Sequence, residues 1–276
     1  MYVRPRTLDE AVQALEMSDM QILAGGTDFY PAHVGRTVTA PVLDITGIGE
    51  IAGIATSADH VRIGAGATWS QLIATPLPAC FDALKAAARE VGSIQIQNRA
   101  TIAGNLCNAS PAADGVPPLL TLDAEVELLS RAGARRLPLA SFITGNRKTE
   151  RKANEILSAI IVPRTIDGPS AFVKLGARRY LVISIAMVAA VIERDGKGAV
   201  SQARIAVGSC SAVARRLPEL EQRLRGAPCK PGLGDLVEAG HLAALSPIDD
   251  ARATAAYRRD AARTLVARAI EQCVGG

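Results

Sequence analysis

Residues 101–114 read TIAGNLCNASPAAD, a run of small side chains, hydroxyls and amides that ends in one carboxylate, Asp114. Because none of these side chains is both bulky and polar, the backbone can approach a ligand closely. The hydroxyls and amides are able to bond to hydroxyl and phosphate groups. The run closes a polar stretch at 92–114 that we predict to be one long loop, and long loops inside compact domains are usually functional. An Ω-loop packed on itself is the alternative.

A second candidate ligand loop, AGGTD at residues 24–28, follows a predicted strand at 21–24. Paired glycines allow a tight turn in which consecutive backbone N–H groups face an anion, and the Thr27 hydroxyl adds a donor. This pattern is typical of phosphate binding, and a plain β-turn is the alternative. In the first loop, the hydroxyl and amide groups of residues 101–114 are suited to bind the ribityl hydroxyls and the diphosphate of a flavin dinucleotide.

The composition is that of a folded protein. The chain has 276 residues, of which 49% are hydrophobic and 21% charged, and at about 150 residues per domain this length predicts roughly two domains. The net charge of +4 does not suggest nucleic-acid binding. The nearest basic run has no interleaved aromatic residues, so we interpret it as a solvated loop; it comprises Arg147, Lys148, Arg151 and Lys152.

Cysteine and histidine usage predicts no metal site. The five cysteines form no Cys-x-x-Cys pair, which excludes a disulfide framework and an iron–sulfur or zinc motif. The three histidines lack ligand spacing. No export leader precedes the first predicted helix, and the longest apolar run, at 181–192, is too short to cross a bilayer. We therefore expect a cytoplasmic protein in which residues 181–192 form a buried strand or helix.

Hydrophobic periodicity divides the chain into three units. In the first, a capping box at Thr7 and Glu10 starts a helix, and two strands complete a small β-α-β unit. The second unit contains a capping box at Thr68 and Gln71 and a linker at 164–169 ends it. The third has strands followed by helices, which implies a sheet with helices on one side and an α+β class. The predicted strands lie at 21–24, 42–45, 51–56, 61–65, 124–129, 135–139, 156–162, 171–175 and 203–207, and the last helix at about 251–272.

The two ligand loops belong to a longer succession of motifs. In this order and spacing, the chain resembles the FAD-binding medium subunit of the molybdenum hydroxylases, the group that includes aerobic carbon monoxide dehydrogenase and xanthine dehydrogenase. The motifs are AGGTD at 24–28, VLDI at 42–45, IGA at 63–65, QNRATIAGN at 97–105, NASPAAD at 108–114, EIL at 155–157, VP at 162–163 and YR at 257–258.

The resemblance implies a two-subdomain FAD-binding fold of the vanillyl-alcohol-oxidase (PCMH) type, followed by a C-terminal α+β domain like that of the carbon monoxide dehydrogenase flavoprotein. The FAD-binding domain would span 1–165, with subdomains at about 1–50 and 51–165, and the C-terminal domain 170–276. Asp114 would lie near the ribityl or phosphate region, Leu157 against the flavin ring and Lys174 at the ring edge. Phe172 would shield the ring. The implied diphosphate-binding residues are Ala24, Gly25, Gly26, Thr27, Asp28, Thr101, Ile102, Ala103, Gly104 and Asn105.

One departure from the family pattern concerns the cofactor. Ala103 replaces the first glycine of the usual TIGGN loop, so a methyl group must fit beside FAD. No histidine or cysteine is placed for a covalent link, so non-covalent FAD is expected. Lys174 has two interpretations: it stabilises anionic reduced flavin, or it pairs with a surface carboxylate.

The implied function is electron transfer. Electrons would pass from a molybdopterin centre in a large subunit, through two 2Fe–2S clusters in a small subunit, to FAD in this chain and then to NAD, a quinone or oxygen, in a dimer of heterotrimers. No residue of this chain would touch the organic substrate, whose identity the sequence leaves open. The alternatives are a stand-alone FAD-dependent reductase, for which no proton donor is assigned, and an assembly subunit without cofactor.

Overall fold

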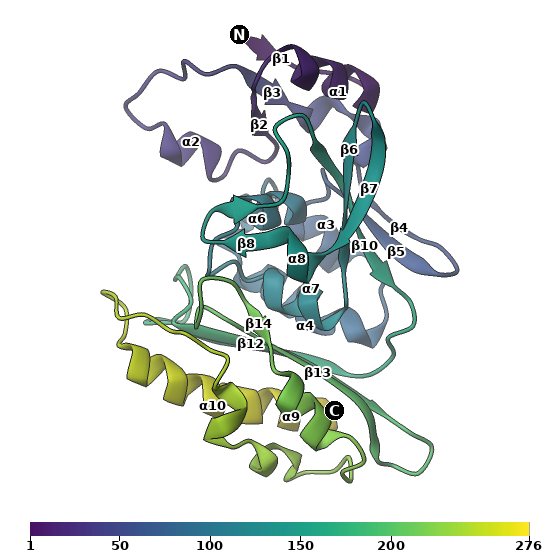
Figure 1. Cartoon of the computed structure of the whole chain (residues 1–276), viewed down its shortest axis with the longest axis vertical. Coiled ribbons are helices and arrows are strands. Elements are labelled where there is room, and N and C mark those ends of the chain that lie inside the picture. Colours follow the sequence, from purple (N-terminus) through teal and green to yellow (C-terminus); the bar gives the residue numbers. More distant parts are fainter. Residues whose placement is uncertain (276) are drawn as a thin grey trace.

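The computed structural model describes residues 1–275 and arranges them in three tiers that follow the chain. Figure 1 shows a small sheet at the N-terminus, a larger sheet in the middle and a third sheet, covered by helices, near the C-terminus. The α+β class and the pairing of an FAD-binding fold with a C-terminal domain agree with this arrangement.

The first tier is a parallel sheet with β3 between β1 and β2. The hydroxyl of Thr7 accepts a hydrogen bond of 3.2 Å from the amide of Glu10, as the capping box predicts. The Glu10 carboxylate reaches one residue further back and accepts from the amide of Arg6 at 2.6 Å. The elements are β1 (Tyr2–Val3), α1 (Leu8–Met17), β2 (Gln21–Leu23), α2 (Phe29–Ala32) and β3 (Val42–Asp44).

The middle tier is an antiparallel sheet in the order β4-β5-β10-β6-β7. Its central strand β10 is buried from Ile156 to Val162, in line with its apolar sequence. The capping box of Thr68 and Gln71 forms in full and starts α3. The elements are β4 (Ile54–Thr56), β5 (His60–Gly64), α3 (Trp69–Ala74), α4 (Asp82–Glu90), α5 (Ile94–Gln97), α6 (Ile102–Asn108), α7 (Val116–Thr121), β6 (Glu125–Ser130), β7 (Gly133–Pro138), α8 (Leu139–Phe142), β8 (Ile143–Gly145), β9 (Lys148–Thr149) and β10 (Ile156–Pro163).

The prediction of one long loop over 92–114 is wrong, because α5 and α6 form within it. The Thr101 hydroxyl caps α6 by accepting a hydrogen bond from the Gly104 amide. The side chains of Ile102 and Leu106 lie on one face of α6, and both are fully buried. Packing of this face offsets the low helix propensity of Gly104 and Asn105.

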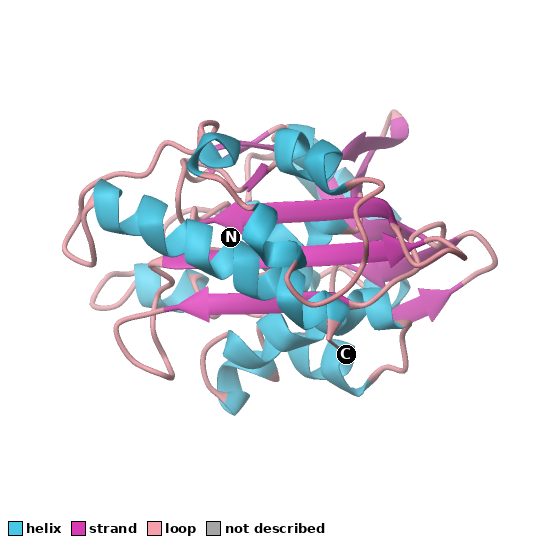
Figure 2. Ribbon diagram, turned by 90° about the horizontal axis from the view of Figure 1, so that it is seen from below, coloured by secondary structure: helices cyan, strands magenta, loops and turns pink. Residues whose placement is uncertain are grey.

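The third tier is an antiparallel sheet in the order β11-β12-β13-β14. Helices α9 and α10 cover one face, and α10 runs along the strands in Figure 2. Helices α4 and α7 of the middle tier pack against the other face. The third unit's own helices thus lie on one side of its sheet, as predicted, and the middle tier covers the other side. The elements are β11 (Ser170–Leu175), β12 (Ala186–Arg194), β13 (Val200–Gly208), β14 (Arg215–Arg216), α9 (Pro218–Leu224) and α10 (Ala255–Val274).

Only the second part of the apolar run at 181–192 forms the predicted buried strand, because β12 begins at Ala186, whereas Leu181 and Ile183 are exposed. Within β12, Val191 packs into the core shared with the middle tier. Its neighbours Ala190 and Ile192 pack into the core beneath α9 and α10. Every residue from Ala186 to Ile192 is buried, as expected for a strand enclosed on two sides. Among residues 1–275, no helix is long and apolar enough to span a membrane.

Candidate cofactor-binding site

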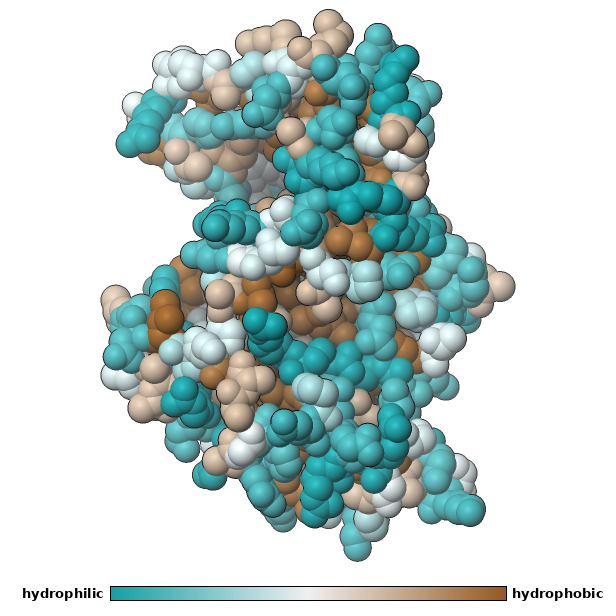
Figure 3. Space-filling view, viewed as in Figure 1, coloured by the Kyte–Doolittle hydropathy of each residue, from teal (hydrophilic) through white to brown (hydrophobic). Residues whose placement is uncertain are grey.

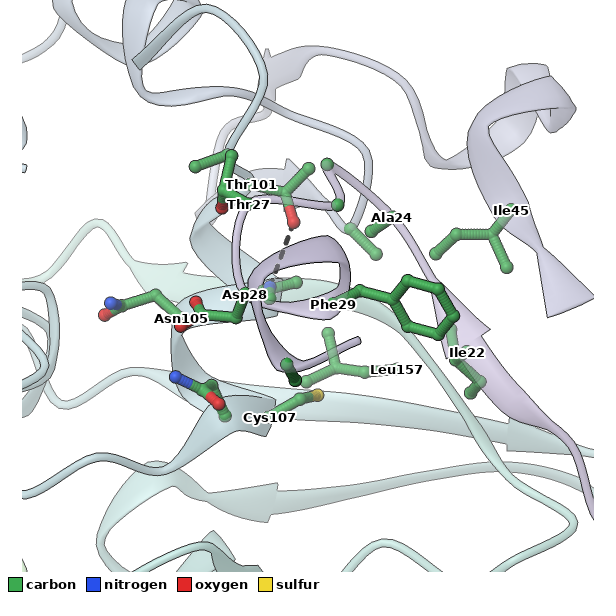
Figure 4. Close-up of a pocket in the computed structure, with 18 of the residues that line it drawn as sticks. Ile22, Ala24, Thr27, Asp28, Phe29, Ile45, Thr101, Asn105, Cys107 and Leu157 are labelled. Carbon is green, nitrogen blue, oxygen red and sulfur yellow. Dashed lines mark hydrogen bonds between the residues drawn. The ribbon is translucent and has the colours of Figure 1, made fainter. Parts of the chain in front are cut away.

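A cavity of about 670 Å³ opens between the first and middle tiers. In Figure 3 the surface is hollowed below the α2 segment. The loop after β2, helix α6, strand β10 and the β8–β9 hairpin contribute its lining, and Figure 4 shows their side chains converging. The volume lies within the usual range of cofactor and small-molecule sites.

The loop at 24–28 forms one wall and depends on its glycines. A Cβ on Gly25 would overlap the backbone carbonyl oxygen of Arg99, so the two ligand loops touch here. Gly26 has a φ of +78°, which favours glycine, and a Cβ there would meet the ring of Tyr30. Within the described chain, the amides of Gly26, Thr27 and Asp28 donate to no protein acceptor. They are therefore free to bind an anionic ligand.

The start of α6 forms the opposite wall. The hydrogen bond of 3.0 Å from the Gly104 amide to the Thr101 hydroxyl is drawn in Figure 4. Asn105 lines the cavity, and its Oδ1 is buried without a hydrogen-bond partner in the part of the chain that the structure describes. A buried acceptor without a donor costs free energy. This oxygen lies beside Gly115, so it gains a donor from a ligand only when the Asn105 side chain turns toward the cavity.

The cavity brings together ten of the thirteen residues predicted from the sequence. Leu157, on β10, comes from a segment far along the chain from either loop. Ile102 does not face the cavity, because it is fully buried in the core. Asp114 and Lys174 also lie outside the lining. The ten lining residues are Ala24, Gly25, Gly26, Thr27, Asp28, Thr101, Ala103, Gly104, Asn105 and Leu157.

Asp114 and Lys174 form a buried ion pair between the tiers. The Lys174 ammonium lies 2.7 Å from a carboxylate oxygen of Asp114, and the side chains are only 7% and 9% exposed, respectively. The Ser184 hydroxyl donates to the other oxygen at 2.7 Å. Burial raises the pKa of the Asp114 carboxyl above its ordinary value, and Lys174 and Ser184 counteract part of this rise. Lys174 thus pairs with a carboxylate, but a buried one and not one at the surface as the sequence interpretation had it.

Lys174 and Phe172 also line a second, smaller hollow. Its volume is about 390 Å³, and Glu90, Arg178 and Arg179 contribute to the lining. Phe172 is thus separated from the residues that line the main cavity.

Sequence reasoning missed two groups of lining residues. Ile22, Phe29 and Ile45 give the cavity an apolar end; Phe29 directly follows the AGGTD motif, which could have indicated it. Arg147 and Arg151, interpreted as part of a solvated loop, line the cavity from the β8–β9 hairpin and the segment after it. Their spacing alone carries no such signal, because the hairpin is placed by contacts distant in sequence.

Two family models together match nearly the whole chain. The FAD binding domain in molybdopterin dehydrogenase matches residues 1–165, and the CO dehydrogenase flavoprotein C-terminal domain matches residues 171–273.

Comparison with individual proteins also finds similarity to FAD-binding subunits of dehydrogenases. The chain is 32% identical to the putative xanthine dehydrogenase FAD-binding subunit of Escherichia coli, over 99% of this chain and 95% of that one. It is 34% identical to the nicotinate dehydrogenase FAD-subunit of Eubacterium barkeri, over 82% and 80%. Among solved structures, a chain of Cu,Mo-CO dehydrogenase matches with a TM-score of 0.91 at 27% identity, over 99% and 97%.

Proposed function

Since the chain belongs to the family of FAD-binding subunits of molybdopterin dehydrogenases, we propose that it holds FAD without a covalent link in the cavity between residues 24–28 and 101–105. The chain is the flavoprotein subunit of a multi-subunit, molybdenum-containing oxidoreductase, and it acts in electron transfer. The observation that carries the binding site is the convergence of both glycine-containing loops on one cavity.

The residues present fit FAD. Amides free of protein acceptors at Gly26, Thr27 and Asp28 match the acceptor oxygens of a diphosphate. Asn105 lines the cavity, and its side-chain amide is able to bond to a hydroxyl such as those of the ribityl chain. The methyl group of Ala103 is 4% exposed and largely packed into the core, so this departure from the family's glycine leaves the cavity open.

Bound FAD supplies the redox chemistry, which is the uptake of electrons and their release to an acceptor. The protein's part is to bind and orient it. We propose that the amides of residues 26–28 hold the phosphates, that Asn105 accepts from a ribityl hydroxyl, and that Leu157 packs against the flavin ring. The assignment of Asp114 to the ribityl or phosphate region and of Lys174 to the ring edge remains a proposal, and both would act there as one ion pair.

The arrangement of subunits and domains extends the proposal. We place the FAD-binding domain at 1–165 and the C-terminal domain at 170–276, of which residue 276 lies outside the described residues. The partners would be a large molybdopterin subunit and a small subunit with two 2Fe–2S clusters, in a cytoplasmic dimer of heterotrimers. NAD, a quinone or oxygen would be the electron acceptor.

An FAD titration of the purified full chain tests the binding proposal. We expect the absorption bands of bound oxidised flavin, and release of intact FAD on denaturation, which also tests for the absence of a covalent link. Co-purification with molybdenum and iron–sulfur subunits tests the assembly and separates it from a stand-alone reductase. A chain that leaves the flavin spectrum unchanged at excess FAD would refute the proposed site.

A further inference from the structure

The two arginines that line the main cavity differ in their hydrogen-bond partners. The ionisable side chains of the cavity include one carboxylate, Asp28, and two guanidinium groups, Arg147 and Arg151. The Nη1 of Arg151 donates to the backbone carbonyl oxygens of Lys152 at 3.0 Å and Glu155 at 2.8 Å, and Arg151 forms no ion pair within residues 1–275. Arg147 donates only to the neutral Asn108 side chain and forms no ion pair within residues 1–275. Within the described residues neither arginine has a carboxylate partner, but only Arg147 also lacks a backbone acceptor for its guanidinium group.

The backbone holds Arg147 in place by an unusual contact. Arg147 has a φ of +59° and Ala109 a φ of +47°, and such left-handed conformations are unfavourable for residues with a Cβ. The two residues are joined, because the Arg147 amide donates to the Ala109 carbonyl oxygen at 2.9 Å. This bond fixes the turn between β8 and β9 to the end of α6. As a result, the Arg147 guanidinium lies on the cavity wall beside Asn108.

The buried pair of Asp114 and Lys174 differs from Arg147, because its positive charge has a carboxylate partner. There the lysine's charge is balanced by a carboxylate at 2.7 Å, so the pair contributes little net charge to its surroundings. Arg147 is exposed at the cavity wall and its charge remains available. A ligand that carries negative charge is the complement of such a wall.

We propose that Arg147 supplies the counter-charge for the FAD diphosphate. This inference rests on the proposed function and adds a residue to it that neither glycine loop contains. Oxidised FAD carries its formal negative charges on the diphosphate, and riboflavin lacks that group. Arg147 therefore increases affinity for the charged cofactor and leaves affinity for the uncharged ring system unchanged.

Titration of the full chain with FAD and with riboflavin, at low and at high salt, tests the inference. The variant Arg147→Gln removes the charge and keeps a side chain able to bond to Asn108. Lys148→Gln is the matched control, because Lys148 is the next residue of the same hairpin, is exposed and does not line the cavity. Circular dichroism of both variants checks that the fold is retained.

We expect Arg147→Gln to raise the Kd for FAD about 10- to 100-fold at low salt, as for loss of a charge-assisted hydrogen bond. The effect should shrink at high salt, where the charge is screened. Lys148→Gln should change the Kd less than about twofold, as for an exposed charge. Equal weakening of FAD and riboflavin, or no difference between the two variants, would overturn the role of Arg147 and leave the FAD site intact. Failure of the unaltered chain to bind FAD would instead overturn the site itself.

Discussion

Replacing Lys174 with methionine leaves the Asp114 carboxylate in the interior with Ser184 as its side-chain donor. The side chains of the pair are only 7% and 9% exposed, so most of the lost interaction is with a buried carboxylate. Removing one partner of a buried ion pair costs about 3–5 kcal/mol. Protonation of Asp114 limits the cost, because neutralising a carboxyl of ordinary pKa about 3.9 at pH 7 takes about 4 kcal/mol. We expect a loss of about 3–4 kcal/mol in the free energy of unfolding at pH 7.

The loss should depend on pH with a defined sign. Without Lys174, burial raises the folded-state pKa of Asp114 further above its unfolded value. A carboxyl with a raised folded-state pKa favours folding below its ordinary pKa, and that contribution is lost as the pH rises through the folded-state value. The variant should therefore be closest to the unaltered chain near pH 4 and fall behind it toward neutral pH.

Urea unfolding followed by the fluorescence of Trp69 measures this effect, since Trp69 is the only tryptophan and is fully buried. Lys197→Met is the control, because Lys197 lies exposed in the turn between β12 and β13. The double variant of Asp114→Asn with Lys174→Met should lose less than Lys174→Met alone, since no unpaired charge remains. Equal losses for Lys174→Met and Lys197→Met, or a loss independent of pH, would refute the reasoning.

Three further predictions follow from the contacts. Gly25→Ala should abolish FAD binding, measured by flavin absorption, because its Cβ would overlap the Arg99 carbonyl, whereas Gly196→Ala, with open space around it, should bind normally. On acidification, Glu155→Gln should lose less free energy of unfolding than the unaltered chain does. Arg135 lowers the pKa of Glu155 in the folded state. The stability that ionised Glu155 contributes is therefore present above its ordinary pKa and is lost as the pH falls below that value. Cys107 lines the cavity, so FAD should slow its alkylation, as mass spectrometry would detect; an unchanged rate would contradict the site.

Elements that depend on local contacts could be predicted from the sequence. The capping box of Thr68 and Gln71 starts α3 as expected, because both hydrogen bonds lie within one helical turn. Helix α6 could not be predicted in this way. It contains Gly104 and Asn105, both weak helix formers, and it is stabilised by burial of Ile102 and Leu106 against distant parts of the chain.

The same distinction applies to the site. The glycines at 25, 26 and 104 could be recognised because their backbone role leaves a local signature. The charges could not be assigned, since a lysine or arginine in a sequence does not reveal its partner. Lys174 meets Asp114 across the contact between the middle and third tiers. Arg147 reaches the cavity only because its turn is bonded to Ala109.

Strand β10 contributes two adjacent residues to the cavity and carries an irregularity directly after them. Its apolar sequence from Ile156 to Val162 predicts a buried strand, in which consecutive side chains point to opposite faces. Yet Ile156 and Leu157 both line the cavity. The pairing of β10 with β6 shifts register between Leu157 and Ala159, as in a β-bulge. A bulge redirects side chains beside functional sites, and this one resets the alternation from Ser158 onward, directly after the two cavity residues, which themselves pair with β6 in regular register. Uniform apolar patterning hides the shift, because every residue of the run would be buried in either register.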